Sequence, residues 1–318
     1  MMKKILIASV VAGCVVMALI IRNSSDDGAK FNISICKAIE HEALNSVAAG
    51  VQDYVRGKLG DRVAFKVDTC QGNAAIASQI ISKFVSSKSD VVVAIGTMPA
   101  QVAYKHAQKG VIRLVFSSVT NPNNISMSLE NANTTGVSNF VPLEPQIALF
   151  MKLQPNLKKL GIIYNAGETN SVDIVERLKD VVKEYGIELV EQSIQRALDI
   201  PQATEALTAK GVDAVFISND NMALANIPLI VKLCGKVPVY VSDTDQVKMG
   251  CVASLGPNQY DIGVQTGKII EKVLNGVDIN TMKVEYTGST ELYLNAKQAA
   301  KVGINIPHDI SALAKKIY

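Results

Sequence analysis

Short runs of β-branched residues alternate with amphipathic helical runs between residues 31 and 255. Strands that are separated by helical segments are parallel, because a parallel connection needs a crossover of a dozen or more residues. The pattern therefore predicts an α/β fold built on doubly wound parallel sheets. Strands are expected at FNISIC (31–36), VAFKVD (63–68), DVVVAIG (90–96), VIRLVFSS (111–118), LGIIYN (160–165), IELVEQSI (187–194), VDAVFIS (212–218), VPVYVSD (237–243) and CVASLG (251–256).

Apolar residues at helical spacing predict the helices that pack on these sheets. Three such stripes lie at residues 44–59, 76–84 and 175–185. Asn170 and Ser171 precede the third stripe and have the side chains preferred at helix caps. We expect these stripes to form core.

The chain of 318 residues is long for one compact core, so we expect two lobes. The segment 135–143 interrupts the alternation after four strands and is the expected passage between them. A helix at 261–274, a strand-like run at 282–286 and a helix near 295–301 suggest that the chain then crosses back. The expected first lobe is 31–140 plus about 256–286, and the second is 141–255 plus about 287–318.

The first 30 residues differ from the rest of the chain. Lys3 and Lys4 precede the apolar run Ile5–Ile21, a pattern typical of an export signal or a membrane anchor. A short segment ending at Cys14 resembles a lipoprotein cleavage box, which would leave that cysteine lipidated. The run stays apolar after Cys14, which favours an uncleaved anchor or an ordinary signal peptide. Each alternative places the body of the protein outside the cytoplasmic membrane, with 22–30 as a tether.

Cysteines can pair outside the cytosol. Cys36 and Cys70 close the first two strands, which are neighbours in most doubly wound sheets, so a disulfide could join them. Cys234 and Cys251 flank the strand at 237–243 and could form another. The alternative is four buried thiols, since free cysteine packs as a small hydrophobe. The Cys and His spacing predicts no metal site.

The composition is 48% hydrophobic and 19% charged, as in a well-filled α/β interior. The net charge is only +3, and the lysines are scattered along the chain. A nucleic-acid-binding surface needs basic residues gathered on a face or stripe, so no nucleic-acid partner is expected.

Ligands of parallel α/β sheets bind beyond the carboxyl ends of the strands. Here those ends read GTMP, SSVTNP, YNAGETNS, SNDN and SDTD, rich in hydroxyls and amides. Thr97 and Ser118 are expected near helix starts, whose free N–H groups suit a carboxylate or a phosphate. Asp220 and Asp243 end strands of the second lobe and could receive an ammonium group. A zwitterion fits this lining, although each residue alone could be an ordinary helix cap.

Enzymatic activity is not expected. His41, His106 and His308 lack an adjacent nucleophile motif, and no GxSxG, P-loop or GxGxxG sequence follows a strand. Asp243 and Asp245 could do acid–base chemistry, but no reactive partner lies beside them in the sequence. No cofactor is expected.

Several segments resemble, in matching order, the extracytoplasmic substrate-binding proteins of ABC importers, in the family with tryptophan- and phenylalanine-binding members. The similarity covers roughly 31–310, and YNxGExNS (164–171) and TGVS (135–138) are its most specific parts. The resemblance implies a three-crossover (type I) hinge, a cleft that closes on a small ligand, commonly an aromatic amino acid, and an ABC permease as partner. A monomer is expected. The other matching segments are 39–45, 70–73, 94–101, 117–122, 218–222 and 254–267.

The same resemblance implies the ligand-binding residues. Their roles follow from the helix starts and strand-end acids described above: Thr97 and Ser118 would hold the carboxylate, and Asp220 and Asp243 the ammonium. From the first lobe it implies Thr97, Met98, Gln101, Ser117, Ser118 and Thr120, and from the second Asn165, Glu168, Asn170, Ser171, Asp220, Asn221 and Asp243, with Glu40 and His41 at the rim.

Walls for an aromatic ligand could come from Tyr164, Phe116, Tyr240 or Met98, with core packing as the alternative for Phe116 and Tyr240. Other functions remain open at this point. They are the binding of an aliphatic amino acid or a modified base, a sensing ectodomain that passes closure to a membrane partner, and a hydrolase that uses cleft carboxylates.

Overall fold

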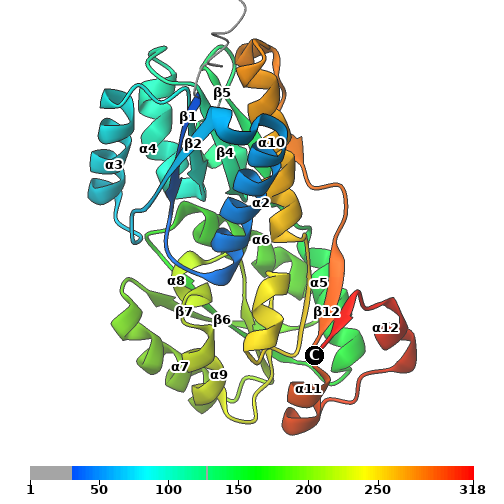
Figure 1. Cartoon of the computed structure of the whole chain (residues 1–318). Helices are drawn as coiled ribbons and strands as arrows, with labels where there is room; N and C mark the ends of the chain where they lie inside the picture. Colours follow the sequence, from blue (N-terminus) through cyan, green and yellow to red (C-terminus); the bar gives the residue numbers. More distant parts are fainter. Residues whose placement is uncertain (1–30, 127) are drawn as a thin grey trace, which may run out of the picture.

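The computed structural model describes residues 31–126 and 128–318. They form two α/β lobes, one above the other in Figure 1. The predicted anchor or signal segment, including Cys14, lies outside the described residues. Within the described residues no helix is long and apolar enough to cross a membrane.

The N-terminal lobe contains a parallel sheet of six strands in the order β11-β5-β4-β3-β1-β2. Its two central strands are buried on both faces, as is typical of parallel sheets: residues 91–95 read VVVAI and residues 114–119 read LVFSSV. The strands are β1 (Phe31–Lys37), β2 (Val63–Thr69), β3 (Val91–Ile95), β4 (Leu114–Val119), β5 (Thr134–Ser138) and β11 (Glu285–Tyr286).

Two pairs of helices cover this sheet: α3 (Ala74–Ser86) with α4 (Thr97–Ala107), and α2 (Glu42–Leu59) with α10 (Gln259–Leu274). Figure 1 shows α2 and α10 side by side, although they are 200 residues apart in the chain. Their backbones meet at two glycines. A Cβ atom on Gly50 would lie 2.2 Å from the carbonyl oxygen of Tyr260, and one on Gly263 would lie 2.1 Å from that of Val47.

The C-terminal lobe contains seven strands in the order β13-β12-β10-β9-β8-β6-β7, parallel except where β12 meets β10. The strands are β6 (Lys159–Asn165), β7 (Glu188–Ile194), β8 (Ala214–Ile217), β9 (Val239–Val241), β10 (Ala253–Gly256), β12 (Glu291–Leu294) and β13 (Lys316–Ile317). The helices are α5 (Leu143–Leu153), α6 (Thr169–Glu184), α7 (Ile200–Ala209), α8 (Asn221–Leu224), α9 (Ile227–Cys234), α11 (Ala296–Val302) and α12 (His308–Leu313), and a 3₁₀ segment, η4 (Thr244–Met249), follows β9.

The chain crosses between the lobes three times, at 139–142, 257–258 and 287–290. The predicted fold class, two parallel-sheet α/β lobes with a three-crossover hinge, is confirmed. At the first crossing the structure differs from the prediction, because residues 134–138 form a fifth strand, β5, before it. Gly136 permits its close approach to β4, since a Cβ atom there would lie 2.1 Å from the carbonyl oxygen of Phe116.

Of the two alternatives left open by the sequence, the structure has the buried thiols: all four cysteines of the described residues are free and buried. The strand register pairs Cys36 with Asp68, two residues before Cys70, so the two cysteines are only diagonal neighbours. The Cys70 thiol donates instead to the carbonyl oxygens of Lys37 and Ala38, both at 3.2 Å. Cys234 and Cys251 pack in the apolar core on one face of the C-terminal sheet.

Candidate ligand-binding cleft

The carboxyl ends of the strands of both lobes face each other across a narrow cleft. We call its inner part the central pocket. Its volume is about 10 Å³, so the side chains of the two lobes almost meet there. The lining is mostly hydroxyl, amide and acid groups: His41, Leu44, Gly96, Thr97, Ser118, Thr120, Asn139, Asn170, Asn219, Asn221, Leu224 and Asp243.

A chain of buried hydrogen bonds joins the lobes at this pocket. Asn139 donates from Nδ2 to Ser118 Oγ at 2.8 Å, and Ser118 Oγ donates to Gln259 Oε1 at 3.2 Å. Gln259 donates in turn from Nε2 to Asp243 Oδ1 at 3.0 Å. The sequence prediction missed Asn139, which begins the first hinge crossing, and Gln259, which follows the second, because only the ends of the predicted strands were searched.

Ser118 does not stand at a helix start, contrary to the prediction. It lies at a register irregularity of β4 and has a φ of 53°, in the left-handed region that side chains with a Cβ atom rarely adopt. This conformation costs about 1–2 kcal/mol. Its hydrogen bonds to Asn139 and Gln259 hold the hydroxyl at the pocket, and backbone strain of this kind is commonly found at functional sites.

Two buried polar atoms of the pocket have no hydrogen-bond partner among the described residues: His41 Nδ1 and Asn139 Oδ1. The side chains are only 7% and 5% exposed. Burying a polar atom without a partner costs free energy, so both atoms indicate a polar ligand. His41 therefore lines the pocket rather than its rim. Burial lowers the pKa of His41 to about 4, which keeps the imidazole neutral at neutral pH.

Asp243 is the acid of the central pocket and is 4% exposed. Burial and, to a smaller extent, the charge of Asp245 raise its pKa to about 7. Gln259 supplies one hydrogen bond to Oδ1. A carboxylate in this position is stabilised by a cation placed beside it, because an opposite charge offsets the cost of burial.

Asp220 does not make the predicted ammonium contact. It is fully buried, and both of its oxygens accept backbone N–H groups. Oδ1 accepts from Ala223 at the start of α8, and Oδ2 accepts from Asn165 at the end of β6. Asp220 therefore ties α8 to the neighbouring strand and does not line the central pocket.

Glu168 also accepts hydrogen bonds from backbone N–H groups at the start of α8. Its Oε2 accepts from the backbone N of Asn221 at 3.1 Å, and its Oε1 accepts from the backbone N of Met222 at 3.2 Å. Burial and the charge of Asp220 raise its pKa to about 7. The two acids together fix the start of α8, which presents Asn221 and Met222 to the cleft.

The cleft continues outward into a second space, which we call the outer pocket, with a volume of about 180 Å³. Asn221 lines both pockets. Of the predicted residues, Met98, Asn165 and Glu168 belong to the outer pocket, and Thr97, Thr120 and Asn170 belong to the central one. The outer pocket is lined by Ala38, Ile39, Gly72, Met98, Asn165, Gly167, Glu168, Gln195, Asn221 and Met222.

Besides Asp220, four predicted residues line neither pocket. Ser117 and Ser171 are fully buried in the lobes, and the hydroxyl of Ser117 is hydrogen-bonded to that of Thr266 in α10 at 2.7 Å. Gln101 lies at the cleft edge, and Glu40 is exposed at the rim, where it pairs with Lys37.

Of the four residues predicted to contact an aromatic ligand, three pack in the cores of the lobes instead. Phe116 and Tyr240 are fully buried, and the Tyr240 ring stacks on Phe150 with 4.3 Å between centroids. Tyr164 packs against the core of the C-terminal lobe. Met98 alone of the four lines a pocket.

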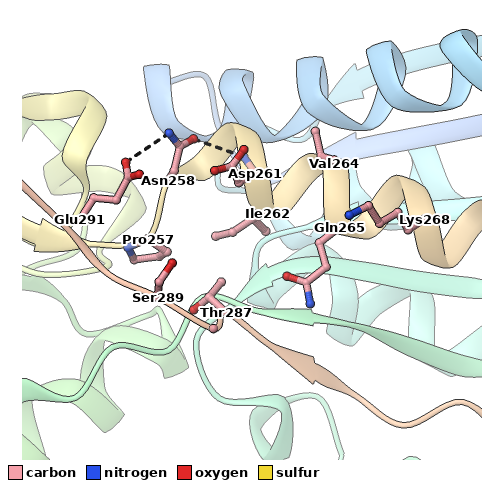
Figure 2. Close-up of a pocket in the computed structure, with 11 residues that line it drawn as sticks. Pro257, Asn258, Asp261, Ile262, Val264, Gln265, Lys268, Thr287, Ser289 and Glu291 are labelled. Atoms are coloured by element: carbon pink, nitrogen blue, oxygen red, sulfur yellow. Dashed lines mark hydrogen bonds between the residues drawn. The ribbon is translucent and has the colours of Figure 1, made fainter. Parts of the chain in front are cut away.

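Another hollow, of about 280 Å³, lies along the hinge between α10 and the crossing 287–290. Figure 2 shows Asn258 between two acids there: its side chain donates to Glu291 at 3.5 Å and accepts from the backbone N of Asp261 at 3.2 Å. None of the predicted ligand-binding residues lines this hollow. Its walls belong to the hinge rather than to the cleft.

Direct contacts hold the lobes together across the cleft. Glu42 of α2 and Lys248 of η4 form an ion pair at 2.7 Å. Gln101 donates to Thr169 Oγ1 at 3.2 Å, and Asn121 donates to Asp173 Oδ2, also at 3.2 Å. The structure is therefore in a closed conformation.

Two α/β lobes, three crossings and a polar cleft between strand ends define a type I periplasmic binding protein. Residues 32–318 match the model of the family described as ABC transporter substrate binding protein, and the chain belongs to this family. Proteins of the family bind a small ligand outside the cytoplasmic membrane and work with a permease.

Known relatives agree with this class. A "Tyrosine-binding protein" of Clostridioides difficile (strain R20291) is 29% identical over 92% of this chain and 90% of its own. A Streptococcus pneumoniae ABC domain solved in complex with L-Trp is 26% identical, with a TM-score of 0.86 over 91% of this chain and 100% of that one.

A third comparison bears on the conformation. The ligand-free, open structure of a Clostridium difficile substrate binding protein with adhesive properties is also 26% identical, but its TM-score is 0.66 over 90% of this chain and 98% of that one. The two structures have the same sequence identity to this chain, so the lower TM-score of the open one is expected if its lobes are rotated relative to each other. The lobe arrangement of this chain is thus closer to that of the L-Trp complex.

Proposed function

We propose that this protein captures an aromatic amino acid outside the cytoplasmic membrane and delivers it to the permease of an ABC importer. The observation that carries the proposal is the pairing, in one pocket, of the buried Asp243 carboxylate with the unpartnered Asn139 Oδ1. Both groups accept hydrogen bonds, they come from opposite sides of the cleft, and an ammonium group donates to both.

The carboxylate group of the ligand has hydrogen-bond donors in the N-terminal lobe. α4 is 11 residues long and begins there with Thr97, so its first N–H groups and partial positive charge favour an anion. The preceding Gly96 has a φ of 97°, which brings the backbone into the pocket without a side chain in the way. The hydroxyls of Ser118 and Thr120 and the His41 ring add further polar groups.

Ligand binding and lobe closure are coupled in this arrangement. In this closed form the central pocket has room for about one water molecule, so the lobes must part to admit a ligand and would close around it less tightly than they do here. A ligand that contacts both Thr97 and Asp243 makes its full set of contacts only when the lobes come together again. Its differential affinity then stabilises the closed form, which is the form offered to the permease.

The aromatic class is supported by the relatives, one named for tyrosine and one solved with L-Trp. The alternative ligands are an aliphatic amino acid or another small solute such as a modified base.

Calorimetric titration of refolded protein tests the proposal. Residues 31–318 contain both sheets and their cores, so protein starting at Lys30 can be unfolded, refolded and freed of carried-over ligand. The chain has no Trp, so the fluorescence of added tryptophan reports its own binding. One-to-one, saturable binding of an aromatic amino acid is expected. A folded sample that gives no heat with any amino acid would reject the proposal.

A further inference from the structure

Two methionines face the outer pocket from opposite lobes. Met98 is the second residue of α4 in the N-terminal lobe, and Met222 is the second residue of α8 in the C-terminal lobe. Each is partly exposed and packs by one side against the core of its own lobe. The free sides of both side chains therefore belong to the cleft.

The outer pocket continues from the place proposed for the ligand's charged groups. Asn221 is common to both pockets, and Met98 directly follows Thr97 of the central pocket. An amino acid whose ammonium and carboxylate lie in the central pocket would extend its side chain into the outer one.

The size and chemistry of this space suit a ring. Its volume is about 180 Å³, and an apolar cavity of about 150 Å³ is enough to hold benzene. Ala38 and Ile39 add apolar surface on the side of the N-terminal lobe. Thioether sulfur is polarizable and makes favourable contacts with aromatic rings, and the unbranched side chain adapts to rings of different shape.

Building on the proposed function, we propose that Met98 and Met222 clamp the aromatic ring of the ligand between the lobes and thereby set the preference for aromatic over small amino acids. The ring would be held by one methionine in the open form and by both after closure. The two methionine side chains would then contact the ligand ring in place of Phe116 and Tyr240, which are buried in the cores.

The direct test is NMR of protein labelled with ¹³C in the methionine methyl groups. Titration with L-phenylalanine should shift the methyl signals of both Met98 and Met222 upfield, because the bound ring lies against them. Met98→Leu and Met222→Leu assign the signals. Met249, exposed at the end of η4 and lining neither pocket, is the control and should not move. Calorimetric binding of phenylalanine with both signals unmoved would overturn the clamp.

Affinities give a second, independent test. Met98→Ala and Met222→Ala should each weaken phenylalanine binding about tenfold, the usual effect of removing contacts from an apolar pocket, while L-alanine binding stays within twofold. Met249→Ala should leave both unchanged. Wild-type protein that binds phenylalanine, with variants that bind it equally well, would overturn the clamp alone. Wild-type protein that binds no amino acid would overturn the proposed function together with the clamp.

Discussion

Gln259 donates from Nε2 to Asp243 Oδ1 at 3.0 Å, and so ties the first residue of α10 to the acid of the central pocket. The chain has just crossed from the C-terminal to the N-terminal lobe at this residue. Gln259 also accepts from Ser118 in the N-terminal lobe. The orientation of the Asp243 carboxylate is therefore coupled to the position of the hinge.

Replacing Gln259 should weaken ligand binding without unfolding the protein. In Gln259→Leu, Asp243 and Ser118 each lose a buried hydrogen bond, and a hydrogen bond to a charged group contributes about 1.5–3 kcal/mol. We expect the dissociation constant measured by calorimetry to rise at least about tenfold. Gln265→Leu, on the same helix but in the hinge hollow, is the matched control and should bind normally. Equal affinities of the two variants would contradict a role for Gln259.

Ligand affinity should increase with pH up to about pH 7. Burial raises the pKa of Asp243 to about 7 in the ligand-free closed form, whereas an ammonium beside it favours the ionised carboxylate. Binding below pH 7 therefore releases a proton, and affinity should fall as the pH drops, by up to about tenfold per pH unit. Asp245→Asn removes a charge that raises the pKa of Asp243, so the midpoint of the profile should move to lower pH.

Asp243→Asn should abolish this pH dependence and most of the affinity. Losing one partner of a buried charge pair costs about 3–5 kcal/mol, equivalent to at least about a hundredfold weaker binding. Calorimetry between pH 5.5 and 8 measures both effects. A variant that keeps the wild-type slope would show that another group, such as Glu168, carries the titration.

The ion pair between Glu42 and Lys248 should slow ligand release. It joins the lobes in the closed form, and both side chains are about 40% exposed, so its contribution is at most about 1 kcal/mol. Glu42→Gln should speed dissociation in stopped-flow experiments by at most about fivefold, and high salt should remove the difference. Glu188→Gln breaks an exposed pair within one lobe and should leave the rate unchanged.

The contact of α2 with α10 gives a stability prediction with an internal control. Gly263→Ala places a Cβ atom against the Val47 carbonyl oxygen, and should destabilise the protein by about 1–3 kcal/mol in urea unfolding. Gly57→Ala, in the same helix pair, meets no atom within 4 Å and should stabilise the protein by about 0.5–1 kcal/mol. Similar effects of the two substitutions would contradict the packing argument.

The fold was predictable because buried parallel strands are strongly hydrophobic and their helices are amphipathic. β5 was not predicted because TTGVS is short and rich in small polar residues. The strand is buried because Gly136 allows a close approach to Phe116. The C-terminal β13 was missed for a related reason, since two exposed residues leave no pattern.

The cleft was predictable only in part. Strand ends identified Thr97, Ser118 and Asp243, whereas the roles of Asp220 and Glu168 depend on which backbone N–H groups lie within reach, and spacing in the chain does not reveal this. Met222 follows SNDN directly and could have been considered as the next residue along. Gln259 has no local signal, because its partners come from two other strand ends.

The packing of α10 on α2 also determines when the first lobe can fold during synthesis. Val47, Val51 and Val55 are buried in a core shared with Ile262, Ile269 and Ile270, and this core cannot form until most of the C-terminal lobe, which precedes α10 in the chain, has been translated. Contacts between residues so far apart in sequence slow folding. The N-terminal lobe, although made first, must therefore remain incomplete until most of the chain exists, so the two lobes cannot complete their folding in the order in which they are synthesised.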